Sequence, residues 1–164
     1  MIIEEGKFYF IKDNFFEKFK EYNLMQNKEN GFKGPCYFCF KNKLQSDIIW
    51  FVPISTKYEK YEKIYKYKKE KQRRVFNFVF GEVLGRKSVF LIQNLFPTTS
   101  EYILEKYTTR DKDVEIDAKV KKKIIAYAKQ VVMMADKGIN ISFNNIIEMK
   151  NILLEKYNKK PFSK

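Results

Sequence analysis

The chain has 164 residues, 17% of them aromatic, and its 33 lysines and arginines against 20 acidic residues give a net charge of +13. This length fits one domain with a hydrophobic core, and the aromatic content argues against a disordered basic chain, because disordered chains are poor in aromatics. The charge favours a polyanionic partner, which could be nucleic acid, an anionic membrane surface or an acidic protein. Because histidine is absent, a histidine-pair ribonuclease and a Ser-His-Asp triad are excluded.

The sequence indicates neither a membrane span nor a metal site. It has no run of about 18 apolar residues, and its N-terminus lacks a basic segment followed by an apolar one, so we expect a cytoplasmic protein without a signal peptide. Cys36 and Cys39 form a C-x-x-C. One such pair cannot complete a four-ligand zinc site without histidine, and residues three apart in a strand point to opposite faces. We therefore expect two ordinary strand cysteines and no cofactor, with a thioredoxin-like motif as the alternative.

Strands are predicted mainly in the first part of the chain. Runs of aromatic and β-branched residues indicate strands, and they occur at Lys7–Lys12, Cys36–Lys41 and Asp47–Ile54 and in a hairpin within 75–94. The hairpin is expected to turn at Gly85-Arg86. Asp47–Ile54 is almost continuously apolar, which is typical of a central strand. Pro53 predicts where that strand ends, because proline cannot donate to the ladder.

Four or five helices are predicted around these strands. Asp13 is expected to cap a short helix that ends near Tyr22 and is followed by a loop over 23–35. The other helices are expected over 59–70, from Thr98 to Tyr107, from Asp117 to Lys137 before Gly138, and from Ser142 to Tyr157. A charged loop is expected over 108–115. Strands before residue 95 and long helices after it are typical of the α+β class, and without a linker or repeat we expect residues 1–164 to form one domain.

The sharpest functional signal lies where the apolar strand ends. Ser55, Thr56 and Lys57 follow Pro53, and residues 57–74 then hold nine lysines or arginines and four tyrosines. A lysine can neutralise charge that develops on a phosphate, and hydroxyls at a helix start can hold phosphate oxygens. The same tripeptide is also typical of a capped helix start with a solvated lysine. The tyrosines can stack on exposed bases, or they can pack on the core.

This combination favours an RNA-cleaving site over other phosphate sites. In RNA the 2′-hydroxyl is a built-in nucleophile, so an enzyme needs mainly in-line positioning, help with proton removal and stabilisation of the phosphorane, and a metal is not required. Lys33, in the early loop, is a second candidate phosphate contact. Its alternative interpretation is an exposed loop charge.

Four segments are similar to those of a known family and occur in the same order: KFYFIKDNFFEKF, PISTKYEKY, FGEVLGRKSVFLIQNLFP and the lysine-rich helix after Asp117. Through them the chain resembles the type III toxins of the ToxN/AbiQ group, and the CptN branch most closely. The most specific features are the N-terminal K-F-Y-x-I strand, the P-[LI]-[ST]-[ST] turn with its nearby lysine, and the N-x-F-P exit after the hairpin.

The resemblance implies a fold, an activity and a partner. The fold would be a compact antiparallel β-barrel-like core of the Kid/MazF type surrounded by four to five helices. The activity would be metal-independent cleavage of adenine-rich single-stranded RNA that leaves 2′,3′-cyclic phosphates. The partner would be an RNA antitoxin, processed by the toxin from tandem repeats, that folds as pseudoknots and joins toxins into closed protein–RNA assemblies. The biology would be abortive phage defence and maintenance of a plasmid or locus.

The resemblance also assigns residues. The family's turn hydroxyls fall on Ser55 and Thr56, and its turn lysine falls on Lys57 or Lys60. A lysine and a tyrosine of the early loop fall near Lys33 and Phe32, although Phe32 cannot exchange a proton. The expected catalytic residues are Lys57, Ser55, Thr56 and Lys33. The expected RNA-binding residues are Phe15, Phe32, Tyr58, Lys60, Tyr61, Lys63, Lys66, Lys68, Lys69, Arg73, Arg74, Lys119, Lys122, Lys123 and Tyr127.

Three other functions remain open from the sequence. A non-catalytic RNA-binding module would share the charge and the aromatic residues. A MazF-like toxin with a protein antitoxin would form a stable dimer without RNA. A basic protein bound to anionic membranes is disfavoured, because no terminal helix is strongly amphipathic.

Overall fold

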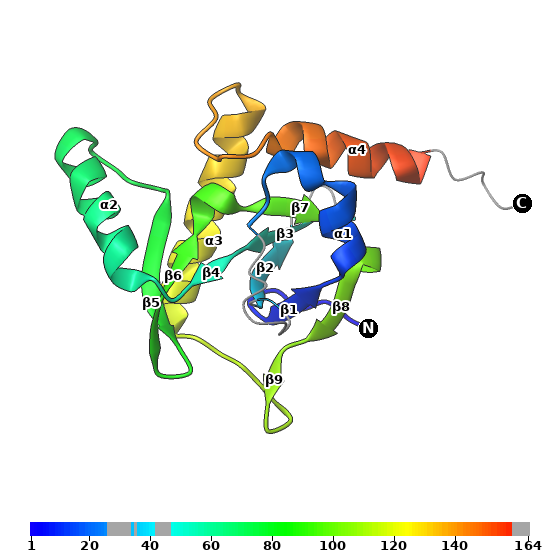
Figure 1. Ribbon diagram of the computed structural model, residues 1–164, viewed down its shortest axis with the longest axis horizontal. Coiled ribbons are helices and arrows are strands. Elements are labelled where there is room, and N and C mark those ends of the chain that lie inside the picture. Colours follow the sequence, from blue (N-terminus) through cyan, green and yellow to red (C-terminus); the bar gives the residue numbers. More distant parts are fainter. Residues whose placement is uncertain (26–33, 35, 42–46, 159–164) are drawn as a thin grey trace, which may run out of the picture.

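The structure is a computed structural model that describes residues 1–25, 34, 36–41 and 47–158. Within this part of the chain, antiparallel sheets are covered by helices, so the predicted α+β class is confirmed (Figure 1). Lys33, Phe32 and most of the predicted 23–35 loop lie outside the described residues, and so does the chain after residue 158.

The larger sheet has five antiparallel strands and forms the centre of the molecule. The strands are β1 (Phe8–Ile11), β2 (Tyr37–Lys41), β3 (Ile49–Val52), β7 (Phe96–Thr98) and β8 (Ile103–Lys106), in the spatial order β7-β3-β2-β1-β8. β3 lies between β2 and β7, and every one of its residues is buried. Because successive side chains of a strand point to opposite faces, a fully apolar strand needs cover on both. The prediction of a central strand is therefore confirmed.

The predicted strand Asp47–Ile54 proves to be two strands that belong to different sheets. The second, β4 (Ile54–Ser55), pairs with β6 (Arg86–Leu91) in a three-stranded sheet of order β4-β6-β5. Pro53 has no N–H for a ladder, but its carbonyl oxygen accepts from the backbone N–H of Leu91 at 2.9 Å. The bend at Pro53 thus carries the chain from one sheet to the other.

The predicted hairpin is confirmed, with a turn one residue earlier than expected. β5 (Phe78–Val83) pairs with β6 in register from Phe78 opposite Leu91 to Val83 opposite Arg86. The turn residues are Leu84 and Gly85, with φ of 51° and 76°. A two-residue turn with two positive φ values matches the right-handed twist of the strands, and glycine is the residue that adopts this conformation at least cost.

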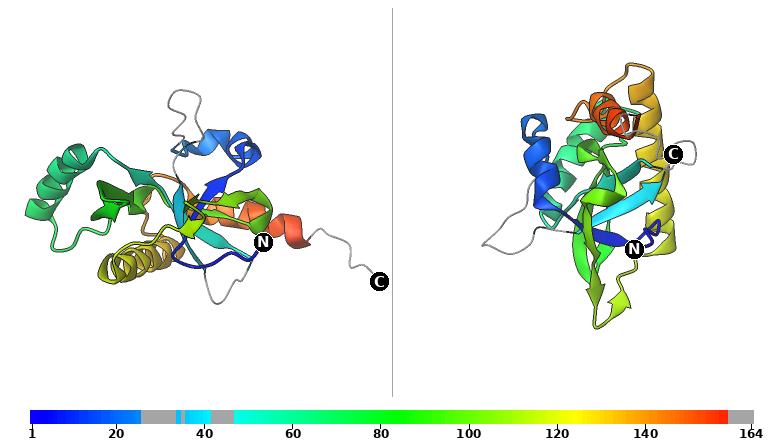
Figure 2. Two further views of the ribbon diagram at one scale, coloured as in Figure 1. Left: turned by 90° about the horizontal axis from the view of Figure 1, so that it is seen from below. Right: turned by 90° about the vertical axis from the view of Figure 1, so that its right-hand side faces the viewer.

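Two long helices cover opposite faces of this hairpin. They are α2 (Tyr58–Lys71) and α3 (Ala118–Asp136), and Figure 2 shows the hairpin between them. Phe78 and Phe80 pack with α2, whereas Val79 packs in the main core, to which α3 contributes. A side chain at Gly81 would collide with Val120 of α3, so the glycine allows that helix to approach closely. The two-residue alternation in the sequence thus assigns one face of β5 to each helix.

The long helix begins and ends where the sequence predicted. Asp117 caps α3, because its carboxylate accepts hydrogen bonds from the backbone N–H groups of Lys119 and Val120 at 2.9 and 3.2 Å. Gly138 follows the helix with a φ of 83°.

The two other helices differ from the prediction at their ends. Asp13 was predicted to cap the first helix, but it is the first residue of α1 (Asp13–Lys18), and the cap position is Lys12, which makes no side-chain capping hydrogen bond. α1 is followed by a separate turn of 3₁₀ helix, η1 (Lys20–Tyr22). α4 (Ile146–Asn158) starts later than expected. The residue that caps it is Asn145 and not Ser142, because the Asn145 side-chain oxygen accepts a hydrogen bond from the backbone N–H of Glu148 at 3.1 Å. The Ser142 hydroxyl donates instead to the carbonyl oxygen of Asn144.

Two segments of the second half of the chain were predicted wrongly. The expected helix from Thr98 to Tyr107 consists of a short 3₁₀ turn, η3 (Ser100–Tyr102), and strand β8, which pairs with β1. The gain from pairing with a neighbouring strand is not visible in the local sequence, which looked like a capping box. The expected loop over 108–115 contains a small hairpin of β9 (Thr108–Thr109) and β10 (Lys112–Asp113), which projects from the body (Figure 1).

The described strands form separate antiparallel sheets of five, three and two strands, and they do not close into a barrel. No helix in the described part of the chain has both the length and the apolar character needed to cross a bilayer.

Candidate functional site

The Ser-Thr-Lys turn lies where β4 passes into α2. Ser55 is buried at the end of β4, and its hydroxyl oxygen accepts a hydrogen bond from the backbone N–H of Lys57 at 3.2 Å. The backbone N–H of Tyr58 donates to the carbonyl oxygen of Thr56 at 2.8 Å. These bonds fix the turn, while the side chains of Thr56 and Lys57 are exposed. Ser55 therefore holds the turn in place, and Thr56 and Lys57 present their side chains at the start of the helix.

A hollow of about 290 Å³ opens at this helix start, and we call it the lysine hollow. Its lining residues are Thr56, Lys57, Tyr58, Glu59, Lys60 and Lys87. Lys87 comes from β6, so a strand and a helix both bring lysines to one place. Free N–H groups and the helix dipole also favour an anion at the start of a helix. Among the described residues, the lysine hollow thus combines three lysines, the hydroxyls of Thr56 and Tyr58 and a helix N-terminus with one carboxylate, that of Glu59.

A second hollow, of about 330 Å³, also has Thr56 in its lining, and we call it the aromatic hollow. It is lined by Phe8, Phe10, Gly34, Cys36, Ile54, Thr56, Val83, Leu84, Arg86, Ser88 and Tyr107. Most of this lining is apolar, and the rings of Phe10 and Tyr107 meet edge to face at 5.6 Å. Burial raises the pKa of the Cys36 thiol to about 12, so at neutral pH the Cys36 side chain adds no charge to this lining. Thr56 lines both the lysine hollow and the aromatic hollow.

Two basic residues of this site, Arg86 and Lys87, were not predicted from the sequence. They follow the turn of the hairpin, and the ammonium group of Lys87 lies 5.4 Å from the centre of the Tyr58 ring. The sequence does contain this basic pair, directly after Gly85, but nothing in it places the pair at the candidate site. What the sequence lacked was the pairing of β6 with β4, which brings this turn beside Thr56.

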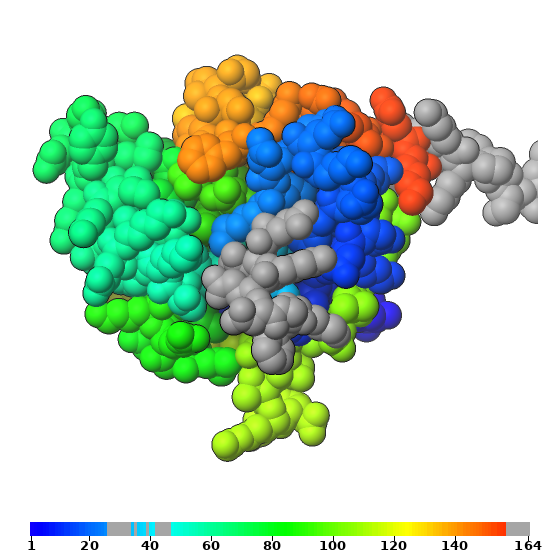
Figure 3. All heavy atoms as spheres, viewed as in Figure 1, coloured from blue at the N-terminus to red at the C-terminus, as the bar shows by residue number. Residues whose placement is uncertain are grey.

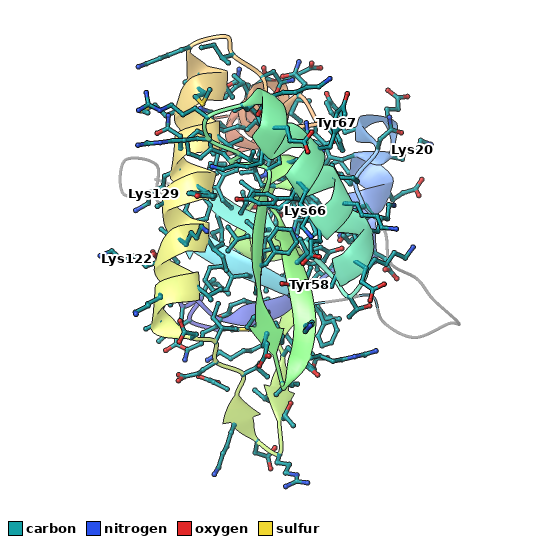
Figure 4. All side chains as sticks on the ribbon, turned by 90° about the vertical axis from the view of Figure 1, so that its left-hand side faces the viewer. Lys20, Tyr58, Lys66, Tyr67, Lys122 and Lys129 are labelled. Atoms are coloured by element: carbon teal, nitrogen blue, oxygen red, sulfur yellow. The ribbon has the colours of Figure 1, made fainter. Side chains whose placement is uncertain are left out.

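The predicted RNA-binding residues of α2 divide into exposed cations and packed tyrosines. Of the predicted cations, Lys68 is half-buried and the others are exposed: Lys60, Lys63, Lys66, Lys69, Arg73 and Arg74. Lys71, which was not among the predicted residues, is exposed as well. Tyr58 and Tyr61 meet the rings of Phe80 and Phe78 at 5.2 and 5.3 Å. The interpretation in which these tyrosines pack on the protein is confirmed, although Tyr58 also lines the lysine hollow. Figure 4 shows Tyr58 near the hairpin and Lys66 and Tyr67 farther along α2.

The basic residues of α3 form a second surface. Lys119, Lys122 and Lys123 are exposed, and the ammonium group of Lys123 lies 5.4 Å from the ring centre of Tyr127. Tyr127 also packs against Phe76, at 5.1 Å between ring centres. Figure 4 shows Lys122 on the far side of the hairpin from α2. The two lysine-rich helices therefore present two separate basic surfaces.

The proposed stacking role of Phe15 is wrong. The ring has no exposed surface, and it packs against Phe19, Phe96 and Tyr102. It lies on the buried face of α1, because an apolar face of a short helix next to a sheet is covered by the core. Phe32 and Lys33 lie outside the described residues.

In the space-filling view, α2 forms one side of the molecule, and α1 lies on the opposite side (Figure 3).

Comparisons with known proteins do not assign the chain to a family. No protein-family model matches the chain, and no curated protein matches it. Among the residues that the structure describes, no three His, Cys, Asp or Glu side chains come together in a group that could hold a metal ion.

Proposed function

We propose that this protein is a metal-independent endoribonuclease and the toxin of a type III, protein–RNA, toxin–antitoxin system. The observation that supports this proposal best is the lysine hollow, where Thr56 and Lys57 stand at a helix start beside Lys60 and Lys87. The segment from Pro53 to Lys57 is also one of the places where the chain resembles the ToxN/AbiQ group.

The proposed reaction is attack by a ribose 2′-oxygen on the neighbouring phosphorus. A bond forms between the 2′-oxygen and phosphorus, the bond from phosphorus to the 5′-oxygen breaks, and the products are a 2′,3′-cyclic phosphate and a 5′-hydroxyl. The Lys57 ammonium group would stabilise the charge of the pentavalent phosphate, and the Thr56 hydroxyl would donate to one of its oxygens. Ser55 would position both groups through its hydrogen bond to the Lys57 N–H.

The remaining cations of the site would bind the rest of the RNA. Lys60 and Lys87 line the lysine hollow and would neutralise the flanking phosphates, and Lys60 is the alternative for the family's turn lysine. Proton transfer to and from the reacting oxygens is assigned to Lys33 or to a tyrosine. The lysines of α2 and α3 would hold antitoxin RNA by phosphate contacts.

The wider biology is proposed on the same resemblance. The partner would be a pseudoknot repeat RNA that the toxin processes and that then occupies the active site, in closed assemblies of toxins bridged by RNA. The protein would act in the cytoplasm in abortive phage defence. Its two larger sheets, joined at Pro53, would correspond to the barrel-like core of the Kid/MazF and ToxN toxins.

The decisive experiment is a cleavage assay in excess EDTA. The purified chain is incubated with adenine-rich RNA, and the new 3′ ends are analysed. The wild type is expected to produce cyclic-phosphate ends. Lys57→Ala is expected to reduce cleavage by a factor of about 100 or more, in the range seen when one donor to a transition-state oxyanion is removed. Because the Lys57 side chain is exposed and makes no capping hydrogen bond, this variant should fold normally.

The matched control is Lys63→Ala, which removes the same charge from the exposed part of α2 without touching the lysine hollow. It should weaken RNA binding slightly and leave cleavage of bound RNA intact. If both variants lose cleavage only in proportion to binding, Lys57 has no chemical role. If the wild type binds RNA and never cuts it, the protein is an RNA-binding module and not an enzyme.

A further inference from the structure

The aromatic hollow has a lining that suits a flat, uncharged ring. Phe10 and Tyr107 supply aromatic surface at one side, and the hairpin tip supplies Val83 and Leu84. Arg86 is exposed at the rim, and the Ser88 hydroxyl donates to the Arg86 carbonyl oxygen at 3.1 Å. Among the described residues of this lining, Arg86 is the one cation, and most of the other groups are apolar and cannot replace the water around a charge. These described residues therefore suit an uncharged ring better than an anion.

The position of the aromatic hollow connects it to the reaction. It meets the lysine hollow at Thr56, which lines both. A nucleotide carries a flat base and a charged phosphate joined by one ribose, so a chain bound with its phosphate at Thr56 has a base within reach of the neighbouring hollow. Single-stranded RNA is read by unstacked bases that lie on aromatic rings or on arginine and that hydrogen-bond through their edges.

We infer that the aromatic hollow binds one unstacked nucleobase, next to the phosphate held at Thr56 and Lys57. This inference rests on the proposed function and adds to it a specificity site with named residues. Tyr107 provides the ring on which the base lies. Arg86 provides a planar donor group at the rim. The hollow thereby selects the nucleotide beside the cleaved bond.

The test is an abasic scan with an RNA that the protein cannot cut. A ten-nucleotide RNA with a mapped cleavage site receives a 2′-deoxyribose at the attacking position. An abasic nucleotide is then placed at each position in turn, and affinity is measured by fluorescence anisotropy. For the wild type, one abasic position beside the scissile phosphate should weaken binding roughly 5- to 100-fold, as expected for the loss of one stacked base.

Tyr107→Leu should abolish this position effect while leaving the others unchanged, because leucine keeps apolar volume and lacks a flat ring. Arg86→Gln, at an exposed site outside the core, should reduce the same position effect, and it keeps the test valid if Tyr107→Leu is unstable. The matched control is Tyr67→Leu, which changes an exposed tyrosine of α2 that lines neither hollow and should leave the abasic profile intact.

Each outcome decides the inference. If the RNA is bound and cut, but the abasic profile is flat or is unchanged in Tyr107→Leu and Arg86→Gln, the base site is refuted and the ribonuclease proposal stands. If the chain neither binds nor cuts RNA, both are refuted. A single position effect that both variants diminish supports the base site.

Discussion

Burial separates the aromatic residues that could contact RNA under the proposed function from those that hold the fold. Phe15 is at the centre of a cluster, with ring centres of Phe19, Phe96 and Tyr102 at 4.9, 5.3 and 5.4 Å. Tyr107 is half-buried and lines a hollow. Only the second kind of ring has a free surface for a base, so stability and binding should respond to different substitutions.

Phe15→Ala should lower the free energy of unfolding by about 3–5 kcal/mol, because it leaves a cavity in a packed cluster. Urea unfolding followed by tyrosine and tryptophan fluorescence would measure this loss. Phe15→Leu, which fills most of the space, should lose less, and the folded fraction of either variant should bind RNA like the wild type. A variant of normal stability with impaired RNA binding would show that Phe15 contacts RNA after all.

At the scale of elements, ion pairs attach the small β9–β10 hairpin and the adjoining chain to the main sheet. Lys7 lies 3.4 Å from a carboxylate oxygen of Asp113 and 2.6 Å from one of Glu115. Lys106, on β8, pairs with Asp113 at 3.4 Å and also with Glu4. Burial acts to raise the pKa of Asp113, but the hydrogen bonds and charges of Lys106 and Lys7 outweigh it, so that this pKa is lowered. The hydrogen bond from Lys7 likewise lowers the pKa of Glu115.

The pH dependence of stability follows from these directions. A carboxylate whose pKa is lower in the folded state stabilises the fold at every pH above its unfolded value of about 4, and this contribution disappears as the pH falls through the folded pKa. Asp113→Asn should therefore lower the melting temperature by about 1–2 °C at pH 7. As the pH falls below about 4 and through the lowered folded pKa of Asp113, this difference between the variant and the wild type should shrink and then disappear.

Calorimetry at several pH values would measure this difference, with Asp111→Asn as a control at the exposed tip of the same hairpin. A difference between Asp113→Asn and the wild type that persists undiminished at about pH 2.5–3 would show that the ion pairs are not its source.

At the scale of the whole molecule, the position of the hairpin between α2 and α3 creates two basic surfaces. α2 begins at the lysine hollow, whereas α3 packs on the opposite face of the hairpin (Figure 2). Under the proposed function, a short RNA bound at Thr56 would reach the lysines of α2. A long, folded RNA is needed to reach both helices.

This arrangement predicts two different salt dependences. Replacing Lys63, Lys66 and Lys69 by alanine should reduce the slope of log affinity against log salt by about 2, at roughly 0.7 for each lost phosphate contact, with a short single strand or a long RNA. Replacing Lys119, Lys122 and Lys123 should reduce the slope for the long RNA alone. Filter binding at several salt concentrations would measure the slopes, and equal effects of both variants on the short strand would contradict two separate surfaces.

The sequence by itself determined the features that depend on neighbouring residues. The alternation in Phe78–Val83 gave the hairpin strands their two faces, and Asp117 and Gly138 gave the ends of the long helix, because turns and caps are made by residues close in the chain. The sequence also located Ser55, Thr56 and Lys57 at the junction of a strand and a helix.

Only the tertiary structure decided which distant segments meet. Residues 103–106 form a strand because β1 offers a partner, and Arg86 and Lys87 join the candidate site because β6 pairs with β4. Phe15 became a core residue because the sheet beside α1 covers its ring. Strand pairing and the cover of a particular ring depend on contacts between residues far apart in the chain, and the local pattern does not specify which distant segment will supply them.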